Sequence, residues 1–478
     1  MTLPEKPDRT DEMLRAVGAV AVETGVPVYA VGGAVRDRLL GHPVLEIDFV
    51  VAGNADAPAF AETARRRLRG TGYTVFERFG TCSFLVEPYK LEFAGARRES
   101  YRPDSRKPEV QPADLSEDLA RRDFTVNAMA MGIRKSDFGD LIDPFDGRSD
   151  LAGRILRTPL DPLATFSDDP LRILRAARFA GQLGFRIHPD TLAAMRADRE
   201  RVRIVSQERL SDEILKMLSQ PVPSVGLRIL QETGVLEIVF PELSALTGVE
   251  QRDDFHHKDV FEHTLKVVDN IARMTDKPLL RFLALVHDIG KPQVKRFVEG
   301  VGWTFHNHEN VGERMLKRVC GRLKLPNEYL KYSRKLTALH MRPIQLIGGD
   351  VTDSAVRRLL FQAGEDIEDL MMLCRADITS GNPRRAEKHL KNFDAVTERM
   401  REVEEKDKMR AFQSPVRGEE IMELCGIRPG PAVGRLKTAI EEAILDGLIP
   451  NEHDAARDYL LKIKDQALAD PPVKTENQ

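Results

Sequence analysis

Residues 32–41 read GGAVRDRLLG, and residues 46–51, a few positions further on, read EIDFVV. The glycine pair, Gly32 and Gly33, opens a run that is predicted to be helical. Glycine lets the backbone approach a phosphate closely, and the start of a helix offers unpaired amide groups and the positive end of its dipole. This stretch therefore predicts an anion cradle at the start of a helix.

The run EIDFVV carries two acidic residues, Glu46 and Asp48. Its β-branched and aromatic residues predict a strand, on which alternate side chains share a face, so both carboxylates point the same way. Such a pair can hold two divalent metal ions, one to activate an attacking hydroxyl group and both to stabilise charge on a phosphorus atom. Taken alone, the glycine pair fits an ordinary turn with solvated acids better, because short glycine motifs are weak.

Motifs between residues 28 and 172 occur in the order found in one family. After 28–41 and 46–53 come RRDFTVNA at 121–128, LIDPFDG at 141–147 with its continuation to Ile155, and DDPLR at 168–172. Together they resemble the signatures of the class II tRNA nucleotidyltransferase and bacterial poly(A) polymerase family, a branch of the DNA polymerase beta superfamily. Four signatures in the family's order are highly specific, and the third of them is the family's flexible loop.

The resemblance implies roles for individual residues. Glu46 and Asp48 would be the catalytic ligands of Mg2+ in the head, with Glu92 as a third acid on a neighbouring strand. The residues implied to bind the nucleotide are Gly32, Gly33 and Arg36 at the triphosphate, Arg122, Asp123 and Asn127 at the ribose, Asp169 and Arg172 at the base, and Arg175 and Arg178 beside them. Taken alone, Glu92 fits an exposed strand acid equally well.

Asp169 and Arg172 lie three residues apart at the start of a strongly helical segment. We therefore expect them to project from one helix face and to hold each other while presenting an acceptor and donors to a base. Without the surrounding motif, the same spacing is typical of a surface ion pair. A departure from the family pattern lies at Glu46, where the family has Asp. The extra methylene moves the carboxylate, so the resemblance leaves the metal preference of this head open.

Length and composition indicate a large globular protein of two or more cores, with 478 residues, 31% charged and 42% hydrophobic residues. The four cysteines, Cys82, Cys320, Cys374 and Cys425, lack close pairing or zinc spacing, so we expect reduced, packed thiols. The charged start of the chain and the lack of long apolar runs predict no leader and no membrane span, and hence the cytoplasm.

The net charge is only −3, but RNA binding depends on local basic patches rather than on the sum. Arg97 and Arg98, with Arg102, Arg106 and Lys107 close behind, form one such patch. Arginines at 65–67 and 69, and those between 196 and 203, form others. Each patch alone is typical of a solvated surface; beside a nucleotidyltransferase head they favour RNA contacts, so Arg97 and Arg98 are predicted RNA-binding residues.

The pattern of elements predicts an α+β protein. Short β-rich runs at 28–31, 47–51, 73–76, 82–86 and 91–94 alternate with helical runs such as 57–69, which indicates a head with a mixed sheet. After Pro162 apolar residues recur at helical spacing. The expected domains are a nucleotidyltransferase head at 1–160, an all-α neck for base and RNA binding at 161–245, an HD domain at 246–395, and a helical RNA-binding tail at 396–478.

A second set of candidate ligands lies in the helical half. His263, the doublet His287 and Asp288, and Asp377 match the order of ligands in HD-domain metallohydrolases, and His308 resembles a further ligand in many of them. Imidazoles and carboxylates suit Mn2+, Ni2+, Mg2+ or iron, which would activate water against a phosphoester. Some HD domains hydrolyse phosphoesters and others serve as scaffolds. The nearby histidines, His256, His257, His306 and His340, are candidates to orient the ligands.

Near the end of the chain, residues 426–437 read GIRPGPAVGRLK. A proline and glycine turn that enters a basic helix resembles a backbone-phosphate contact, and the family carries such a turn where its tail meets the tRNA elbow. Lys437 is therefore predicted to contact RNA. An interhelical turn fits the pattern equally well.

We therefore expect a template-independent nucleotidyltransferase that adds CMP, CMP and AMP to the 3′ end of tRNA from CTP and ATP. A poly(A) polymerase, or an enzyme that adds only CC or only A, shares every signature. A different class also stays open, namely a phosphoester hydrolase that works through His287 and Asp288, with the head as a binding module. No obligate protein partner and no membrane contact are expected.

Overall fold

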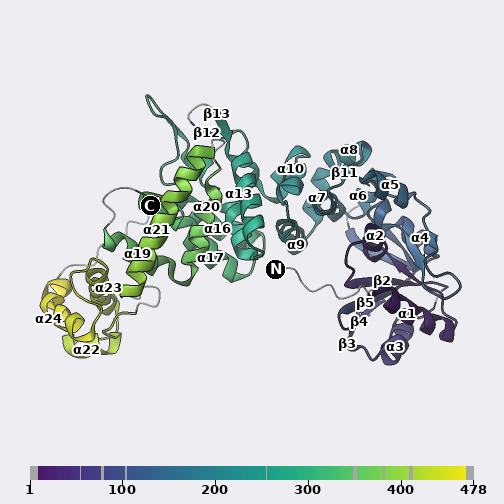
Figure 1. Ribbon diagram of the computed structural model, residues 1–478, viewed down its shortest axis with the longest axis horizontal. Coiled ribbons are helices and arrows are strands. Elements are labelled where there is room, and N and C mark those ends of the chain that lie inside the picture. The colour runs from purple at the N-terminus through teal and green to yellow at the C-terminus, as the bar shows by residue number, and fades with distance from the viewer. Residues whose placement is uncertain are drawn as a thin grey trace. The chain divides into compact units, whose positions relative to one another are not determined.

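The computed structural model of the chain describes residues 9–53, 55–76, 80–102, 105–253, 256–347, 352–379, 383–407 and 413–469 (Figure 1). The chain divides into two compact units, Met1–Ser244 and Ala245–Gln478. The first unit holds a mixed sheet followed by helices, and the second is mostly helical. This arrangement confirms the predicted fold class, α+β with a mixed sheet in the head and helices after it.

The sheet of the first unit has seven strands in the order β3-β4-β5-β2-β1-β8-β9. Its neighbours pair antiparallel, except for β2 and β5, which run parallel. The strands are β1 (Val28–Val31), β2 (Glu46–Val51), β3 (Thr71–Phe76), β4 (Thr81–Val86), β5 (Tyr89–Gly95), β8 (Ala130–Gly132) and β9 (Leu141–Ile142). All five β-rich runs predicted from the sequence are strands of this sheet.

Burial along β2 alternates as the sequence predicts. Ile47 and Phe49 are buried, whereas Glu46 and Asp48 are exposed. On the buried face the Phe93 ring stacks on Phe49 and Phe84, with centroids 4.8 and 5.5 Å away. Such aromatic packing fixes the register of β2 against β5, because a slip by one residue would turn the acids into the core.

The helices of the head are α1 (Thr10–Thr24), α2 (Gly33–Leu40), α3 (Ala57–Leu68), α4 (Leu115–Ala120) and α5 (Gly147–Gly153), with a hairpin of β6 (Arg97–Arg102) and β7 (Ser105–Pro112). Helix α3 packs on β4 and β5, where Phe60 contacts the ring of Phe93. Its start is capped by Asp56, which accepts a hydrogen bond from the Ala59 amide. Helix α4 begins with a full capping box of Asp114 and Glu117.

After the head come α6 (Pro162–Asp168), α7 (Leu171–Leu183), α8 (Pro189–Ala197), α9 (Gln207–Leu218), α10 (Ser224–Glu232), α11 (Val235–Val239) and α12 (Pro241–Ser244). The helical spacing of Leu171, Leu174 and Ala177 is confirmed, since all three are buried on α7. This stretch is not all helix, however. Strand β11 (Arg186–Ile187) pairs in parallel with β10 (Ile155–Leu156), a pairing too short to leave a periodic signal.

The second unit contains α13 (Val260–Met274), α14 (Pro278–Val286), α15 (Lys291–Val294), α16 (His308–Arg322), α17 (Asn327–Leu339), α18 (Arg342–Gln345), α19 (Asp353–Ala363), α20 (Ile367–Asp377), α21 (Pro383–Asp407), α22 (Gly418–Cys425), α23 (Pro431–Leu445) and α24 (His453–Ala469). Two hairpins interrupt the helices and were not predicted. They pair β12 (Glu250–Asp253) with β13 (His256–Asp259), and β14 (Arg296–Val298) with β15 (Gly302–Thr304).

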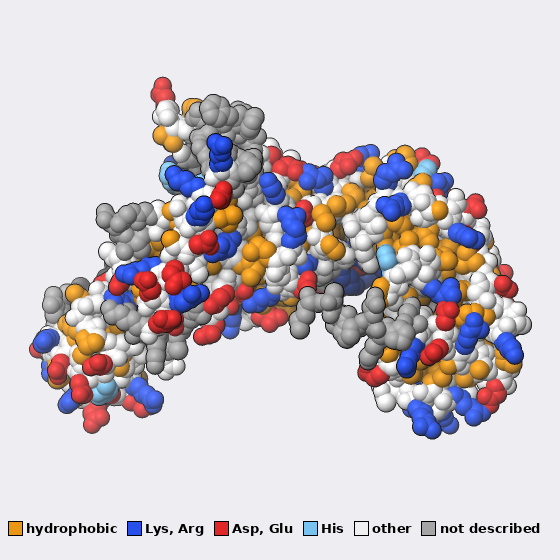
Figure 2. All heavy atoms as spheres, viewed as in Figure 1, with side chains coloured by type: hydrophobic (Ala, Val, Ile, Leu, Met, Phe, Trp, Pro, Cys, Tyr) orange, Lys and Arg blue, Asp and Glu red, His pale blue; other side chains and the backbone are white. Residues whose placement is uncertain are grey.

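The four cysteines are free thiols, and three of them are buried, which confirms the prediction of reduced, packed cysteines. Within the described residues, none of the helices is both long and apolar enough to cross a bilayer. Lysines and arginines alternate with acids over the face shown in Figure 2, in keeping with the small net charge.

Candidate active site and a second ligand cluster

The acidic residues of β2 meet a third acid on the neighbouring strand. The parallel register places Asp48 opposite Glu92 and Glu46 opposite Lys90. The Lys90 ammonium lies 3.6 Å from a carboxylate oxygen of Glu46 and 3.6 Å from one of Glu92. The structure therefore brings together the three acids singled out in the sequence. Oxygen ligands grouped in this way fit Mg2+, which prefers carboxylates.

The electrostatics of Asp48 reflect this crowding. Solvent reaches its side chain, yet burial of the carboxyl among protein atoms raises its pKa to about 6. Arg122 opposes the rise, while the negative charges of Glu92 and Glu46 add to it. The grouped carboxylates thus repel one another unless positive charge lies among them, which is the chemical character of a cation site.

The predicted anion cradle lies next to these acids. Helix α2 begins at Gly33, and Gly32 before it adopts φ 71° and ψ −135°, a left-handed conformation that favours glycine. A Cβ at Gly32 would lie 2.8 Å from Nη1 of Arg122 and 3.7 Å from Oδ2 of Asp48. The positive φ favours glycine at position 32, and the missing side chain leaves room for the Arg122 guanidinium beside Asp48.

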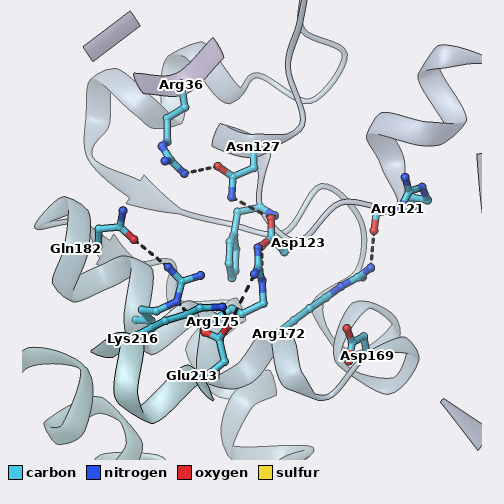
Figure 3. Close-up of polar contacts among 12 residues, drawn as sticks. Arg36, Arg121, Asp123, Asn127, Asp169, Arg172, Arg175, Gln182, Glu213 and Lys216 are labelled. Atoms are coloured by element: carbon cyan, nitrogen blue, oxygen red, sulfur yellow. Dashed lines mark hydrogen bonds and ion pairs between the residues drawn. The ribbon is translucent and has the colours of Figure 1, made fainter. Parts of the chain in front are cut away.

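Four of the predicted nucleotide-binding residues form one chain of hydrogen bonds (Figure 3). Arg36 donates to Asn127 at 2.7 Å, and Asn127 donates to Asp123 at 3.0 Å. Asp123 also accepts two hydrogen bonds from Arg175, at 2.9 and 2.6 Å. Burial alone would raise the pKa of Asp123, but the charge of Arg175 and these hydrogen bonds outweigh it and lower the pKa to about 2.

Glu213 on α9 belongs to the same network and was missed in the sequence. Its buried carboxylate accepts a 2.7 Å hydrogen bond from Arg178 and lies 3.9 Å from Arg175. A signal was available, because position 213 shares a helix face with Leu210 and Met217, both buried. A carboxylate on an apolar face needs a charged partner. It therefore indicates a buried arginine nearby.

The predicted pairing of Asp169 with Arg172 is wrong. Asp169 lies at the end of α6 with extended backbone, before α7 begins, because the following Pro170 disfavours helical conformation at this position. In the described part of the chain these two side chains share no hydrogen bond or ion pair. Asp169 instead lies 3.3 Å from a guanidinium nitrogen of Arg209. Arg172 donates to the backbone carbonyl of Arg121 at 2.5 Å (Figure 3). It also donates to the carbonyl of Thr165 at 3.3 Å.

Asp118 of α4 was also missed, although it holds the arginines of the second signature. Its side chain is 0% exposed and pairs with Arg121 at 2.6 Å and with Arg122 at 3.1 Å. Arg121 in turn provides the carbonyl that Arg172 contacts. Asp118 thereby fixes the Arg122 guanidinium beside Gly32. Through Arg121, it also fixes the carbonyl that Arg172 contacts.

The stretch that resembles the family's flexible loop contains α5. Asp143 accepts hydrogen bonds from the amides of Gly147 and Arg148, at 2.7 and 2.8 Å. Asp150 is buried and accepts a 2.8 Å hydrogen bond from the Thr125 hydroxyl. This links the loop directly to the second signature.

In the second unit, the four predicted ligands gather in one buried cluster. His263 Nε2 lies 2.8 Å from Asp377 and 3.6 Å from Asp288, and His287 Nε2 lies 3.3 Å from Asp288. Helix α16 approaches closely enough that a Cβ at Gly290 would lie 2.2 Å from the His308 carbonyl, so glycine is required at this position. Among the described residues, Nε2 of His287 is buried without a hydrogen-bond partner.

His308 and His340 face this cluster from the other side. Their Nε2 atoms are 3.2 Å apart, and Asp288 lies 3.4 Å from His308 and 3.9 Å from His340. Of the four histidines proposed to orient ligands, His340 is in the cluster, and His306 is exposed. The side chains of His256 and His257 lie outside the described residues.

The tautomers of three cluster histidines follow from their backbone contacts. Nδ1 of His287, His308 and His340 faces the carbonyls of Ala284, Phe305 and Thr337, at 2.9, 2.8 and 2.6 Å. A hydrogen on each Nδ1 turns the Nε2 atoms toward the cluster, the orientation of metal-bound histidines. Among the described residues, two groups of ligand atoms could hold a metal ion: His263, His287 and Asp288, and Asp288, His308 and His340.

The predicted RNA-binding residues lie on exposed elements. Arg98 donates to Gln111 across the β6–β7 hairpin, and the Arg97 amide donates to Asp118. Lys437 is half exposed on α23 and lies 3.9 Å from Glu441. The side chains of Arg102, Arg106 and Lys107 lie outside the described residues.

Three family models match the chain. They are a poly A polymerase head domain over residues 28–157, "Probable RNA and SrmB- binding site of polymerase A" over 184–246, and an HD domain over 260–382. The matched head contains the seven-stranded sheet, the three acids and the start of α2. The first unit is therefore a nucleotidyltransferase of the poly A polymerase head class. An HD domain follows it in the same chain.

Relatives define the family more closely. The multifunctional CCA protein of Methylococcus capsulatus is 35% identical over 442 residues, which cover 88% of this chain and 98% of that protein. The chain belongs to the family of multifunctional CCA proteins. It is similar to a CCA-adding enzyme in complex with CTP, at 26% identity and a TM-score of 0.61 over 98% of this chain and 97% of that one.

A second solved structure is a tRNA nucleotidyltransferase complexed with a primer tRNA and an incoming ATP analogue. It is 27% identical, with a TM-score of 0.57, over 81% of this chain and 99% of that one. These findings confirm the resemblance drawn from the four signatures.

The buried Asp118 leads to a prediction on stability. In Asp118→Asn, two guanidinium groups lose their buried counter-charge, so we expect the free energy of unfolding of the first unit to fall by about 2–4 kcal/mol. A urea titration monitored by circular dichroism measures the unfolding transition of the first unit.

The matched control is Asp114→Asn at the exposed start of the same helix. Asparagine caps a helix about as well as aspartate, so this control should change the free energy by less than about 0.5 kcal/mol. Equal effects of the two substitutions would show that Asp118 does not anchor the arginines.

Proposed function

We propose that this chain adds CMP, CMP and AMP to the 3′ end of tRNA, with CTP and ATP as substrates and no nucleic-acid template. The observation that carries the proposal is the meeting of Glu46, Asp48 and Glu92 on β2 and β5 beside the glycine cradle of α2. Carboxylates for a cation and a helix start for a triphosphate, side by side, fit nucleotidyl transfer. Since its substrates are tRNA and nucleotides, we also propose that it acts in the cytoplasm.

In this mechanism Glu46 and Asp48 hold divalent cations, Mg2+ in our proposal, and Glu92 supports them from β5. Bound there, the cations supply Lewis acidity, which lowers the pKa of the tRNA 3′-hydroxyl and offsets negative charge on the phosphates. The amides at Gly32 and Gly33 receive the triphosphate, and Arg122 adds a positive charge next to them. Pyrophosphate is released as the 3′-oxygen bonds to the α-phosphorus.

The sugar and the base would be held by the network behind the cradle. We propose that Asp123 and Asn127 bind the ribose, fixed in place by Arg36 on one side and Arg175 on the other. Arg178, through Glu213, keeps α7 and α9 together beneath them. Such prior fixation lowers the entropic cost of orienting the nucleotide.

Base selection is assigned to Asp169 and Arg172. Each terminal nitrogen of Arg172 donates one hydrogen bond to a backbone carbonyl. Because a guanidinium group has five N–H donors, three further N–H groups can bond to the edge of a base. Asp169 holds Arg209 and offers a carboxylate acceptor. In our proposal the base of the nucleotide forms hydrogen bonds with both Asp169 and Arg172, which do not bond to each other.

A poly(A) polymerase is the alternative within this class, since the matching head model carries that description. The comparison with relatives favours CCA addition, because the multifunctional CCA protein of Methylococcus capsulatus aligns with this chain over 98% of its own length.

For the HD cluster we propose a bound divalent cation, Mn2+, Ni2+ or Mg2+, held by His263, His287, Asp288 and Asp377. Its chemistry would be the activation of water against a phosphoester. The buried Nε2 of His287, which faces a carboxylate oxygen of Asp288 at 3.3 Å, supports a cation at this place.

The addition reaction tests the head. Purified protein is incubated with tRNA lacking its 3′ CCA, with CTP, ATP or both, and product lengths are read at single-nucleotide resolution. We expect two additions with CTP and a third only when ATP is present as well. In Asp48→Asn the rate should fall by at least about 1,000-fold, because the cation loses a ligand at the reacting centre. Asp288→Asn, a matched change in the other cluster, should leave addition unchanged.

A long ladder with ATP alone would instead make the chain a poly(A) polymerase. Addition that survives in Asp48→Asn but fails in Asp288→Asn would place the chemistry in the HD domain.

Metal content tests the HD cluster independently of catalysis. Equilibrium dialysis of full-length protein against Mn2+, followed by elemental analysis, should reveal a site whose affinity falls roughly 100-fold or more in His263→Ala, because even a residue that only orients a ligand contributes 10- to 100-fold. His306→Ala, at an exposed histidine nearby, is the control and should bind as the unaltered protein does. Equal binding by both variants would contradict the proposed ligand set.

A further inference from the structure

A hairpin with solvent-facing apolar side chains stands beside the HD cluster. Phe297 is 65% exposed, Val301 61% and Val298 41%. The hairpin is the narrow green projection near β12 and β13 in Figure 1, and apolar side chains are visible on it in Figure 2. Large side chains exposed together contribute little to a folded core, so they indicate a binding surface.

Two aromatic rings form the centre of this surface. Phe297 lies opposite Trp303 in the antiparallel pair, with ring centroids 5.3 Å apart and planes at 76°. The ammonium of Lys295 lies 4.3 Å from the centre of the Trp303 ring. Edge-to-face contact and the cation hold both rings in place, so the exposed Phe297 surface is fixed before any ligand arrives.

Both ends of the hairpin lead directly into the HD cluster. Lys291, before β14, lies 2.6 Å from Asp288 and 5.6 Å from the Phe305 ring. His308 follows Trp303 by five residues, which span at most about 18 Å even when fully extended. A ligand on the rings can therefore extend to the cluster.

The charges at this place favour a negatively charged ligand. The Lys291 charge is balanced by Asp288, but Lys295 and the exposed Arg296 lie at the start of β14, while Glu299 lies at the turn. Aromatic rings next to cations are the combination that binds single-stranded nucleic acid, with bases stacked on rings and phosphates near the cations.

We propose that Phe297 and Trp303 form a base-stacking platform for single-stranded RNA, oriented so that a phosphate of the bound strand lies toward the HD cluster. Binding to the platform stands on its own, while the use of the bound strand as a substrate rests on the proposed phosphoester hydrolysis. Because every base has a stacking face, the platform tolerates any sequence.

Intrinsic fluorescence tests the platform, since Trp303 is the single tryptophan among 478 residues. Full-length protein is titrated with hexaadenylate RNA, and we expect saturable quenching as a base stacks next to the indole. Phe297→Ala should weaken this binding about tenfold, the effect of losing one stacking partner. Phe76→Ala is the matched control, a phenylalanine 51% exposed on β3 of the other unit, and should leave the affinity unchanged.

Absence of quenching in the unaltered protein would overturn the proposal. Undiminished affinity in Phe297→Ala, or an equal loss in Phe76→Ala, would overturn it as well. Hydrolysis of bis(p-nitrophenyl) phosphate, a diester without a base, reports separately on the HD centre. If that hydrolysis is absent while quenching persists, the proposed hydrolase fails and the platform stands.

Discussion

The parallel pairing of β2 with β5 is the constraint on which the head depends. It sets Asp48 opposite Glu92 and keeps Glu46 one alternation away on the same exposed face. The free energy that holds this pairing comes from the other face, where Phe49 and Phe93 stack in the core. A buried aromatic contact thus maintains a cluster of mutually repelling carboxylates that would otherwise separate.

A second constraint lies behind that cluster, in buried acids balanced by arginines that are buried or partly buried. Asp123 with Arg175, Glu213 with Arg178, and Asp118 with Arg122 each compensate a charge away from water. Buried pairs of this kind add little net stability, but losing one partner is costly. Their effect here is positional: they fix the helices of the first unit around the start of α2, where we propose that the nucleotide binds.

Local periodicity predicted much of this structure. Alternation along EIDFVV gave the exposed faces of Glu46 and Asp48, and helical spacing gave the buried side of α7. Predictions failed where a single residue or a distant contact decided the outcome. Pro170 separates Asp169 from the helix of Arg172, and no local pattern shows that Arg121 would supply a carbonyl to Arg172 from 51 residues away.

The grouping of His263, His287, Asp288 and Asp377 could be predicted because their order resembles that of the ligands in HD-domain metallohydrolases. The place of His340 opposite His308 depends on how α16 and α17 pack, which the sequence does not display. The β14–β15 hairpin was likewise missed, because three-residue strands fall below the length at which alternation is detectable.

The most direct test of the central claim is the location of metal in crystals grown with CTP and Mn2+, from anomalous diffraction. Our account predicts a Mn2+ ion bound by carboxylate oxygens of Glu46 and Asp48, at about 2.0–2.3 Å as for other hard cations, with the triphosphate at the amides of Gly32 and Gly33. Manganese absent from these carboxylates, or a triphosphate bound away from α2, would contradict it.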